Sequence, residues 1–156
     1  MKFYVVAVGR LKPGPVLALI DDYASRFRKT GRSLGFTALE FIEIDERMAH
    51  DKASQAELIL KAIPEGALIW ACDERGDTMK SEGFAQDLKA QADQGIGSLA
   101  IIIGGADGLD EAVLTAASRK ISFGKMVWPH MLLRVMLSEQ LYRAASILAG
   151  LPYHRA

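Results

Sequence analysis

The C-terminal end of the chain carries the side chains best suited to chemistry. Tyr142 and Arg143 lie in a stretch of helical spacing, and Tyr153, His154 and Arg155 follow it. Core packing alone does not favour this composition, because such side chains need hydrogen-bond partners when buried. Arginine can hold phosphate, tyrosine can stack on a base, and histidine titrates near neutral pH. Together with Arg134, these residues form an aromatic and basic set that can hold phosphate and stack on a base.

A residue pair and a loop near this segment are also candidates for a binding site. Glu139 stands four residues before Arg143, a spacing that also fits an ordinary surface ion pair of small energetic weight. Residues 123–128 offer consecutive backbone donors and acceptors, and Pro129 restricts the conformation of Trp128 before a helix begins. This loop suits a pocket for an adenine ring, although a lone tryptophan is more often a core or interface residue.

Glycines follow a buried strand in the third candidate segment. The apolar run 99–103 leads into Gly104, Gly105 and Gly108, and a helix is expected to begin soon after. Missing side chains let a ligand approach the backbone, and amides near a helix N-terminus can bind its polar atoms. The spacing is not the Gly-x-Gly-x-x-Gly of dinucleotide-binding proteins. A ligand loop and a plain tight turn both remain open for this segment.

Cys72 also stands at the end of an apolar strand. It is the single cysteine, which excludes an intramolecular disulfide, and no specific base can be named beside it. We interpret its thiol as a packing group and not as a nucleophile. Asp73 or Glu74 could hold a ligand hydroxyl or amine, or could be solvated turn carboxylates. Because parallel sheets bind ligands beyond the carboxyl ends of their strands, we expect these strand ends to converge.

Short apolar runs alternate with longer segments of helical spacing, which predicts an α/β fold with a mainly parallel sheet. The 156 residues, half of them hydrophobic, suit one domain over residues 1–156. We expect strands at 2–8, 39–44, 67–71, 98–103 and 120–123 and helices at 15–29, 52–62, 81–94, 110–117 and 131–148. Residues 31–35 and 46–48 are expected to be loops.

Charge and composition restrict the partners. Nineteen Lys and Arg balance nineteen Asp and Glu, so the broad basic field of a general nucleic-acid binder is absent and any RNA contact must be local. We therefore expect a structured RNA recognised by its shape. The sequence has no closely spaced Cys and His residues of the kind that bind zinc, so we do not expect a metal site. No apolar run is long enough to span a membrane, and we expect a reducing cytoplasm as the location.

Several motifs occur in an order that resembles one family. They are Val6-Ala7-Val8-Gly9, Gly104-Gly105-Ala106-Asp107-Gly108-Leu109, Trp128-Pro129-His130 with Arg134, Glu139-Gln140-x-Tyr142-Arg143-Ala144, and Pro152-Tyr153-His154-Arg155. The chain resembles, over its full length, the small SPOUT-class methyltransferases of the RlmH type. These enzymes methylate N3 of a pseudouridine in large-subunit ribosomal RNA.

The resemblance implies an S-adenosylmethionine-dependent enzyme that forms a homodimer and acts on ribosomal RNA in the assembled ribosome. It also implies a trefoil knot in the C-terminal half, which the usual rules of chain connection would not suggest. By motif position, the cofactor contacts are Cys72, Gly104, Phe123, Gly124, Lys125, Met126, Val127 and Trp128. The implied RNA side comprises His130, Arg134, Tyr142, Arg143, Tyr153, His154 and Arg155, of which the last three are the candidate catalytic residues. We expect His154 to be the proton acceptor or base-edge partner.

This sequence departs from the family pattern at several positions. Ala106-Asp107 replace a more usual Pro-Glu, Cys72 replaces a Leu, and Phe123-Gly124 and Val127-Trp128 stand where Leu-Ser and Thr-Leu are more common. Backbone contacts survive such changes, whereas contacts of the lost hydroxyls do not carry over. Two alternatives are a ribosome-binding module without enzymatic activity and a flavodoxin-like nucleotide or flavin protein, which would leave the C-terminal residues unexplained.

Overall fold

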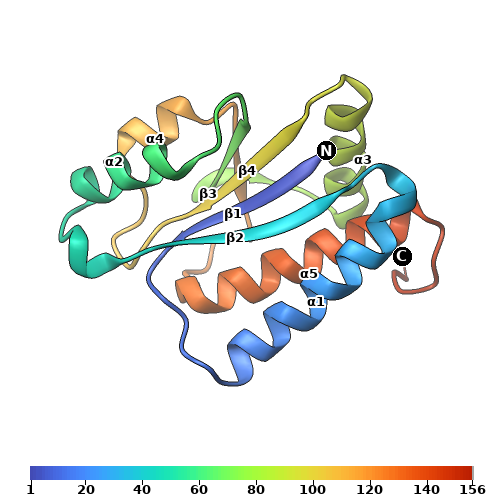
Figure 1. Ribbon diagram of the computed structural model, residues 1–156, viewed down its shortest axis with the longest axis horizontal. Coiled ribbons are helices and arrows are strands. Elements are labelled where there is room, and N and C mark those ends of the chain that lie inside the picture. Colours follow the sequence, from blue (N-terminus) through green and yellow to red (C-terminus); the bar gives the residue numbers. More distant parts are fainter. Residues whose placement is uncertain (156) are drawn as a thin grey trace.

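A five-stranded parallel sheet lies between two layers of helices (Figure 1). The computed structural model describes residues 1–155. The strands are β1 (Lys2–Val8), β2 (Ala38–Ile44), β3 (Leu68–Thr78), β4 (Ser98–Ile103) and β5 (Arg119–Ser122). The helices are α1 (Pro15–Gly31), α2 (Lys52–Ala62), α3 (Ser81–Asp93), α4 (Glu111–Ala116) and α5 (His130–Leu148), with short 3-10 helices at Arg32–Leu34 and Glu46–Met48.

The strand order is β2-β1-β4-β3-β5. Flavodoxin-like proteins order their strands 2-1-3-4-5, so β3 and β4 have exchanged places here. The flavodoxin-like alternative is therefore wrong. The predicted α/β class with a parallel sheet is confirmed.

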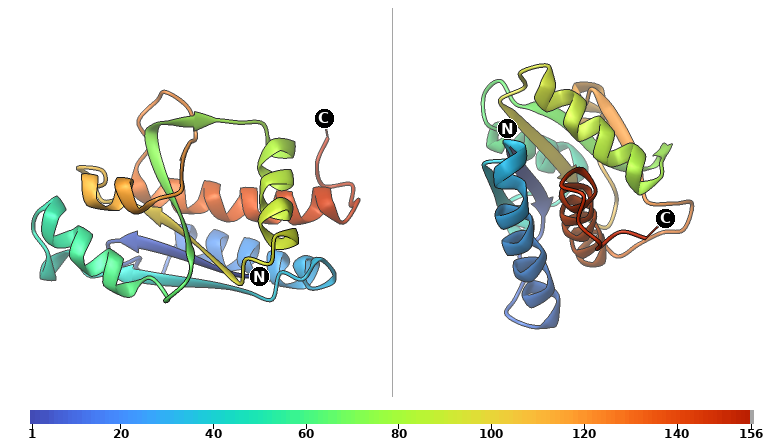
Figure 2. Two further views of the ribbon diagram at one scale, coloured as in Figure 1. Left: turned by 90° about the horizontal axis from the view of Figure 1, so that it is seen from above. Right: turned by 90° about the vertical axis from the view of Figure 1, so that its right-hand side faces the viewer.

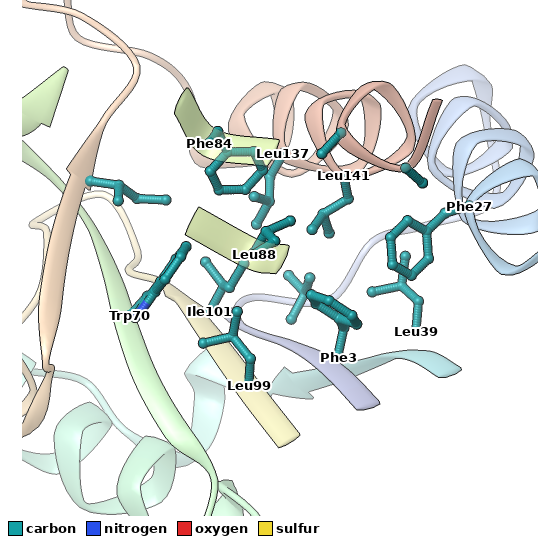
Figure 3. Close-up of a cluster of buried hydrophobic side chains, with 14 of the residues drawn as sticks. Phe3, Phe27, Leu39, Trp70, Phe84, Leu88, Leu99, Ile101, Leu137 and Leu141 are labelled. Carbon is teal, nitrogen blue, oxygen red and sulfur yellow. The ribbon is translucent and has the colours of Figure 1, made fainter. Parts of the chain in front are cut away.

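Side chains that alternate along each strand divide the core in two. Phe3, Val5 and Ala7 of β1 face α1, α3 and α5, whereas Val6 and Val8 face α2 and α4. The larger cluster is shown in Figure 3, where Trp70 of β3 lies beside Phe84 of α3. Leu137 and Leu141 of α5 belong to the same cluster. Figure 2 shows the two helical layers from the side. α5 is thus fixed along most of its length.

The element order follows the sequence prediction, and two details differ. β3 continues to Thr78 instead of ending at Ala71, with a register shift against β5 between Cys72 and Asp77. A Cβ on Gly76 would lie 2.7 Å from the carbonyl carbon of Lys120, so only glycine permits this close second pairing. The segments 31–35 and 46–48 contain a helix end and 3-10 turns.

No helix within residues 1–155 has the length and apolar character needed to cross a membrane. The same residues contain no group of three or more His, Cys, Asp or Glu side chains arranged to hold a metal ion. The trefoil knot stays a prediction.

Candidate active site

A cavity of about 380 Å³ opens at the carboxyl ends of β4 and β5, beside residues 72–75 in the middle of β3. Its size falls in the range of small-molecule sites. Three connecting segments that are far apart in the sequence meet here, as the sequence predicted. The lining residues are Lys52, Cys72, Asp73, Glu74, Arg75, Ile103, Gly104, Gly105, Ala106, Asp107, Gly108, Leu109, Ile121, Ser122, Phe123, Gly124, Met126, Val127, Trp128, His130 and Leu133.

The glycine turn after β4 forms one wall of the cavity. The amide of Gly108 donates to the carbonyl of Gly105 at 3.1 Å, and Gly108 has φ 78°. A Cβ on Gly104 would lie 2.8 Å from both the carbonyl carbon and the oxygen of Gly108. Steric contact therefore requires glycine at position 104, which brings the backbone of residues 104–108 to the cavity surface.

The loop between β5 and α5 forms the opposite wall. Gly124 has φ 117°, and the Ser122 hydroxyl lies 3.0 Å from its carbonyl oxygen and accepts from its amide at 3.2 Å. The sequence prediction did not include Ser122; its position just before a turn glycine was the available signal. Of the predicted loop residues, Lys125 alone lies outside the cavity lining.

Two side chains of β3 close the cavity between these walls. Burial raises the pKa of the Cys72 thiol to about 12, so this group packs and does not act as a nucleophile, as expected. For Asp73, burial acts to raise the pKa, but hydrogen bonds from Arg75 outweigh it and the pKa lies below the ordinary value. The cavity therefore contains an ionised carboxylate at neutral pH.

His130 and Arg134 do not lie with the C-terminal residues. Burial and the nearby Arg134 charge lower the pKa of His130, and its ring lines the cavity, neutral at pH 7. Arg134 is 1% exposed and donates to the carbonyls of Val8 at 2.5 Å and Gly9 at 2.9 Å. The expectation that Arg134 contacts RNA is corrected, because its guanidinium is used inside the protein to hold α5 against the end of β1.

The C-terminal residues form a separate half-buried network on the other end of α5. Glu139 accepts hydrogen bonds from the Tyr153 hydroxyl at 3.0 Å and from Arg143 Nε at 3.0 Å. The Arg143 guanidinium lies 4.8 Å from the Tyr153 ring centre, and the Tyr142 and Tyr153 rings are 4.6 Å apart. Glu139 and Arg143 are thus more than a surface ion pair: they hold the terminal segment on α5.

The protonation states of this network limit its chemistry. Burial and the hydrogen bond to Glu139 raise the pKa of Tyr153, which keeps its hydroxyl protonated at neutral pH. Its bond to Glu139 raises the pKa of Arg143, which stays a cation. Tyr153 can therefore stack or donate, and Arg143 can bind phosphate. Arg155 is exposed.

The network and the cavity lie apart on one chain. Leu133 lines the cavity, and Arg143 follows it ten residues later, so about 15 Å of helix separates them at 1.5 Å per residue. In Figure 1 the loops that line the cavity lie near the start of α5, and the C-terminus lies past its other end. The two predicted halves of the site are thus each assembled, but not next to each other in one chain.

Known proteins resemble this chain over nearly its whole length. A family model described as "Predicted SPOUT methyltransferase" matches residues 1–154. Curated proteins named "Ribosomal RNA large subunit methyltransferase H" from Dinoroseobacter shibae and Roseobacter denitrificans are 55% and 54% identical, each over 99% of both chains.

One solved structure, described as "a probable methylase family protein from Haemophilus influenzae Rd KW20", superposes with a TM-score of 0.51 at 14% identity. The match covers 99% of this chain and 70% of that chain, and it shows the fold alone. The full-length family match and the two relatives carry the assignment: the chain belongs to the SPOUT methyltransferase family.

Proposed function

We propose that this chain transfers a methyl group from S-adenosylmethionine to N3 of a pseudouridine in large-subunit ribosomal RNA, in the cytoplasm. The observation that carries this proposal is the family match over residues 1–154, combined with a cavity at the strand ends where the motifs lie. The names of the two relatives refer to the same RNA, that of the large ribosomal subunit. The short basic and aromatic segment supplies a local RNA contact on a chain of zero net charge.

The cavity fits the cofactor in kind as well as in size. The exposed backbone of residues 104–108 and 122–128 offers amides and carbonyls for the polar edge of adenine, and Leu109 and Ile121 supply apolar contacts. The ionised Asp73 carboxylate can accept hydrogen bonds from ribose hydroxyls or from the amino group. When bound, S-adenosylmethionine supplies a methyl carbon on a sulfonium, which is already an electrophile.

The protein's own task is then to position the acceptor and to receive its proton. Arg143 and Arg155 bind phosphate, Tyr153 stacks on or donates to the base, and His154 accepts the N3 proton. Holding the nitrogen in line with the methyl carbon and sulfur accounts for most of the rate gain.

We further propose that the working site joins two copies of the chain. Five apolar side chains are exposed in the cavity loop and the first turn of α5: Met126 (72%), Val127 (83%), Trp128 (40%), Met131 (43%) and Leu132 (44%). Large apolar side chains exposed together in one short segment are typical of a protein interface. A second copy on this surface can bring its own Tyr153-His154-Arg155 to the cavity and so close the gap along α5.

Mass spectrometry of ribosomal RNA tests the activity. Cells that have the protein should contain a methylated pseudouridine in their large-subunit RNA that is absent when the protein is removed. Calorimetry on the purified protein should show S-adenosylmethionine binding. Identical RNA spectra from both strains would contradict the enzyme and, if the protein still sedimented with ribosomes, would support the non-enzymatic ribosome-binding module instead.

A further inference from the structure

His154 is held from both sides by two different helices. Its Nε2 lies 3.0 Å from the Glu82 Oε1 of α3, and its Nδ1 lies 3.2 Å from the Arg143 Nη1 of α5. The imidazole is mostly enclosed, with 18% of its side chain exposed. The contact with Glu82 was not expected from the sequence, because Glu82 is 72 residues away along the chain.

The two partners determine where the imidazole carries its proton. A guanidinium has only donors, so Arg143 must donate and Nδ1 must accept with its lone pair. The single proton of the neutral ring then stands on Nε2, which donates to the Glu82 carboxylate. His154 is thus fixed as one tautomer, with Nδ1 as the basic nitrogen.

We propose, on the basis of the function proposed above, that Glu82 is a positioning residue that makes Nδ1 of His154 the proton acceptor in the methylation. A carboxylate on one imidazole nitrogen orients the ring and stabilises the imidazolium that forms when the other nitrogen takes a proton. Glu82 and His154 stand in this relation. The hydrogen bond from His154 also lowers the pKa of Glu82, which keeps the carboxylate ionised.

The proton balance of the step is simple. The N3–H bond breaks with its electron pair left on nitrogen, the proton goes to Nδ1, and N3 forms its bond to the methyl carbon as the bond from sulfur to that carbon breaks. The imidazolium later returns the proton to water. Before this step Arg143 must give up its bond to Nδ1, and a phosphate oxygen of the RNA competes for the same N–H.

Several charged groups surround this pair. Glu82 on α3 and the preceding Lys80 face it from one side, and Glu139 and Arg143 face it from α5. Tyr153 lies on the same terminal segment, with its hydroxyl on Glu139. Of these groups, Glu82 is the one whose carboxylate meets the ring nitrogen directly.

Nitrogen-15 NMR and single-turnover methylation test the assignment together. The chain has three histidines, so the His154 signals are those missing from a His154→Gln variant. The neutral ring should show the proton on Nε2. Glu82→Ala should leave the Nε2 proton without its acceptor, shift the Nε2 signal, and slow single-turnover methylation by about tenfold at saturating cofactor, with cofactor affinity unchanged. Glu82→Gln keeps an acceptor oxygen and should retain the tautomer with a smaller loss of rate.

The matched control is Glu65→Ala, an exposed glutamate, which should change neither the spectrum nor the rate. A wild-type ring with its proton on Nδ1, or a Glu82→Ala enzyme at the wild-type rate, would overturn the inference. A wild-type protein that shows the fixed tautomer and binds the cofactor but methylates nothing would instead contradict the proposed function and leave the Glu82–His154 contact confirmed.

Discussion

Replacing Gly104 by alanine is expected to weaken S-adenosylmethionine binding by roughly tenfold to a hundredfold, because overpacking of this kind costs about 1–3 kcal/mol. The added Cβ would lie 2.8 Å from the carbonyl group of Gly108, and both atoms there are backbone. The glycine turn must therefore move, and its backbone forms a wall of the cavity. Calorimetry with the purified variant measures the change in affinity.

Gly97→Ala is the matched control. A Cβ on Gly97 would meet nothing within 4 Å, and its φ is compatible with alanine. This variant should bind the cofactor as the wild type does. If Gly104→Ala also bound the cofactor with unchanged affinity, the glycine turn would not be a wall of the cofactor site.

Arg134→Met is expected to lower the free energy of unfolding by about 3 kcal/mol, because it removes charged hydrogen bonds from a buried site. The guanidinium donates to the carbonyls of Val8 and Gly9 and lies 3.2 Å from Glu43 Oε2. Burial lowers the pKa of this guanidinium, and Glu43 offsets part of that effect. Methionine would fill the space, leave the two carbonyls without the guanidinium donor, and leave Glu43 Oε2 with the Leu11 amide as its donor. Urea unfolding measures the loss.

An exposed arginine provides the comparison. Arg10 has a side chain that is 66% exposed and pairs with Asp45 at 3.8 Å, and Arg10→Met should change stability by no more than about 0.5 kcal/mol. If Arg134→Met lowered the free energy of unfolding by less than about 1 kcal/mol, the expected result would be contradicted. The hydrogen bonds of Arg134 would then do little more than compensate for the cost of burying its charge.

The fold was predictable where hydrophobic periodicity was strong. The expected range of β1 at 2–8 and of α2 at 52–62 agrees with the structure, because clear apolar patterns and end signals define both. The second half of β3 was missed, since Asp73, Glu74 and Arg75 carry no strand pattern. Its pairing depends on Gly76 lying over the backbone of β5, a tertiary contact that no local pattern reveals.

The candidate site was predictable in its position and only partly in its chemistry. The strand-end rule correctly brought Cys72, Gly104 and Phe123 to one cavity. The prediction that Arg134 contacts RNA was wrong, because a motif identifies a residue type at a position but not the direction of its side chain. Glu82 was missed for the opposite reason: it meets His154 through the packing of α3 beside α5, and no spacing in the sequence encodes that contact.

In the homodimer that we propose, the cavity of one chain works with the terminal segment of the other. Gly104→Ala and His154→Ala homodimers should each be impaired in single-turnover methylation at a subsaturating cofactor concentration. Co-expressed with different tags and purified as mixed dimers, they should regain about half of the wild-type activity, since one of the two composite sites then has an intact cavity and an intact His154. A mixed dimer no more active than its two parents would contradict the claim and place the terminal segment's action within its own chain.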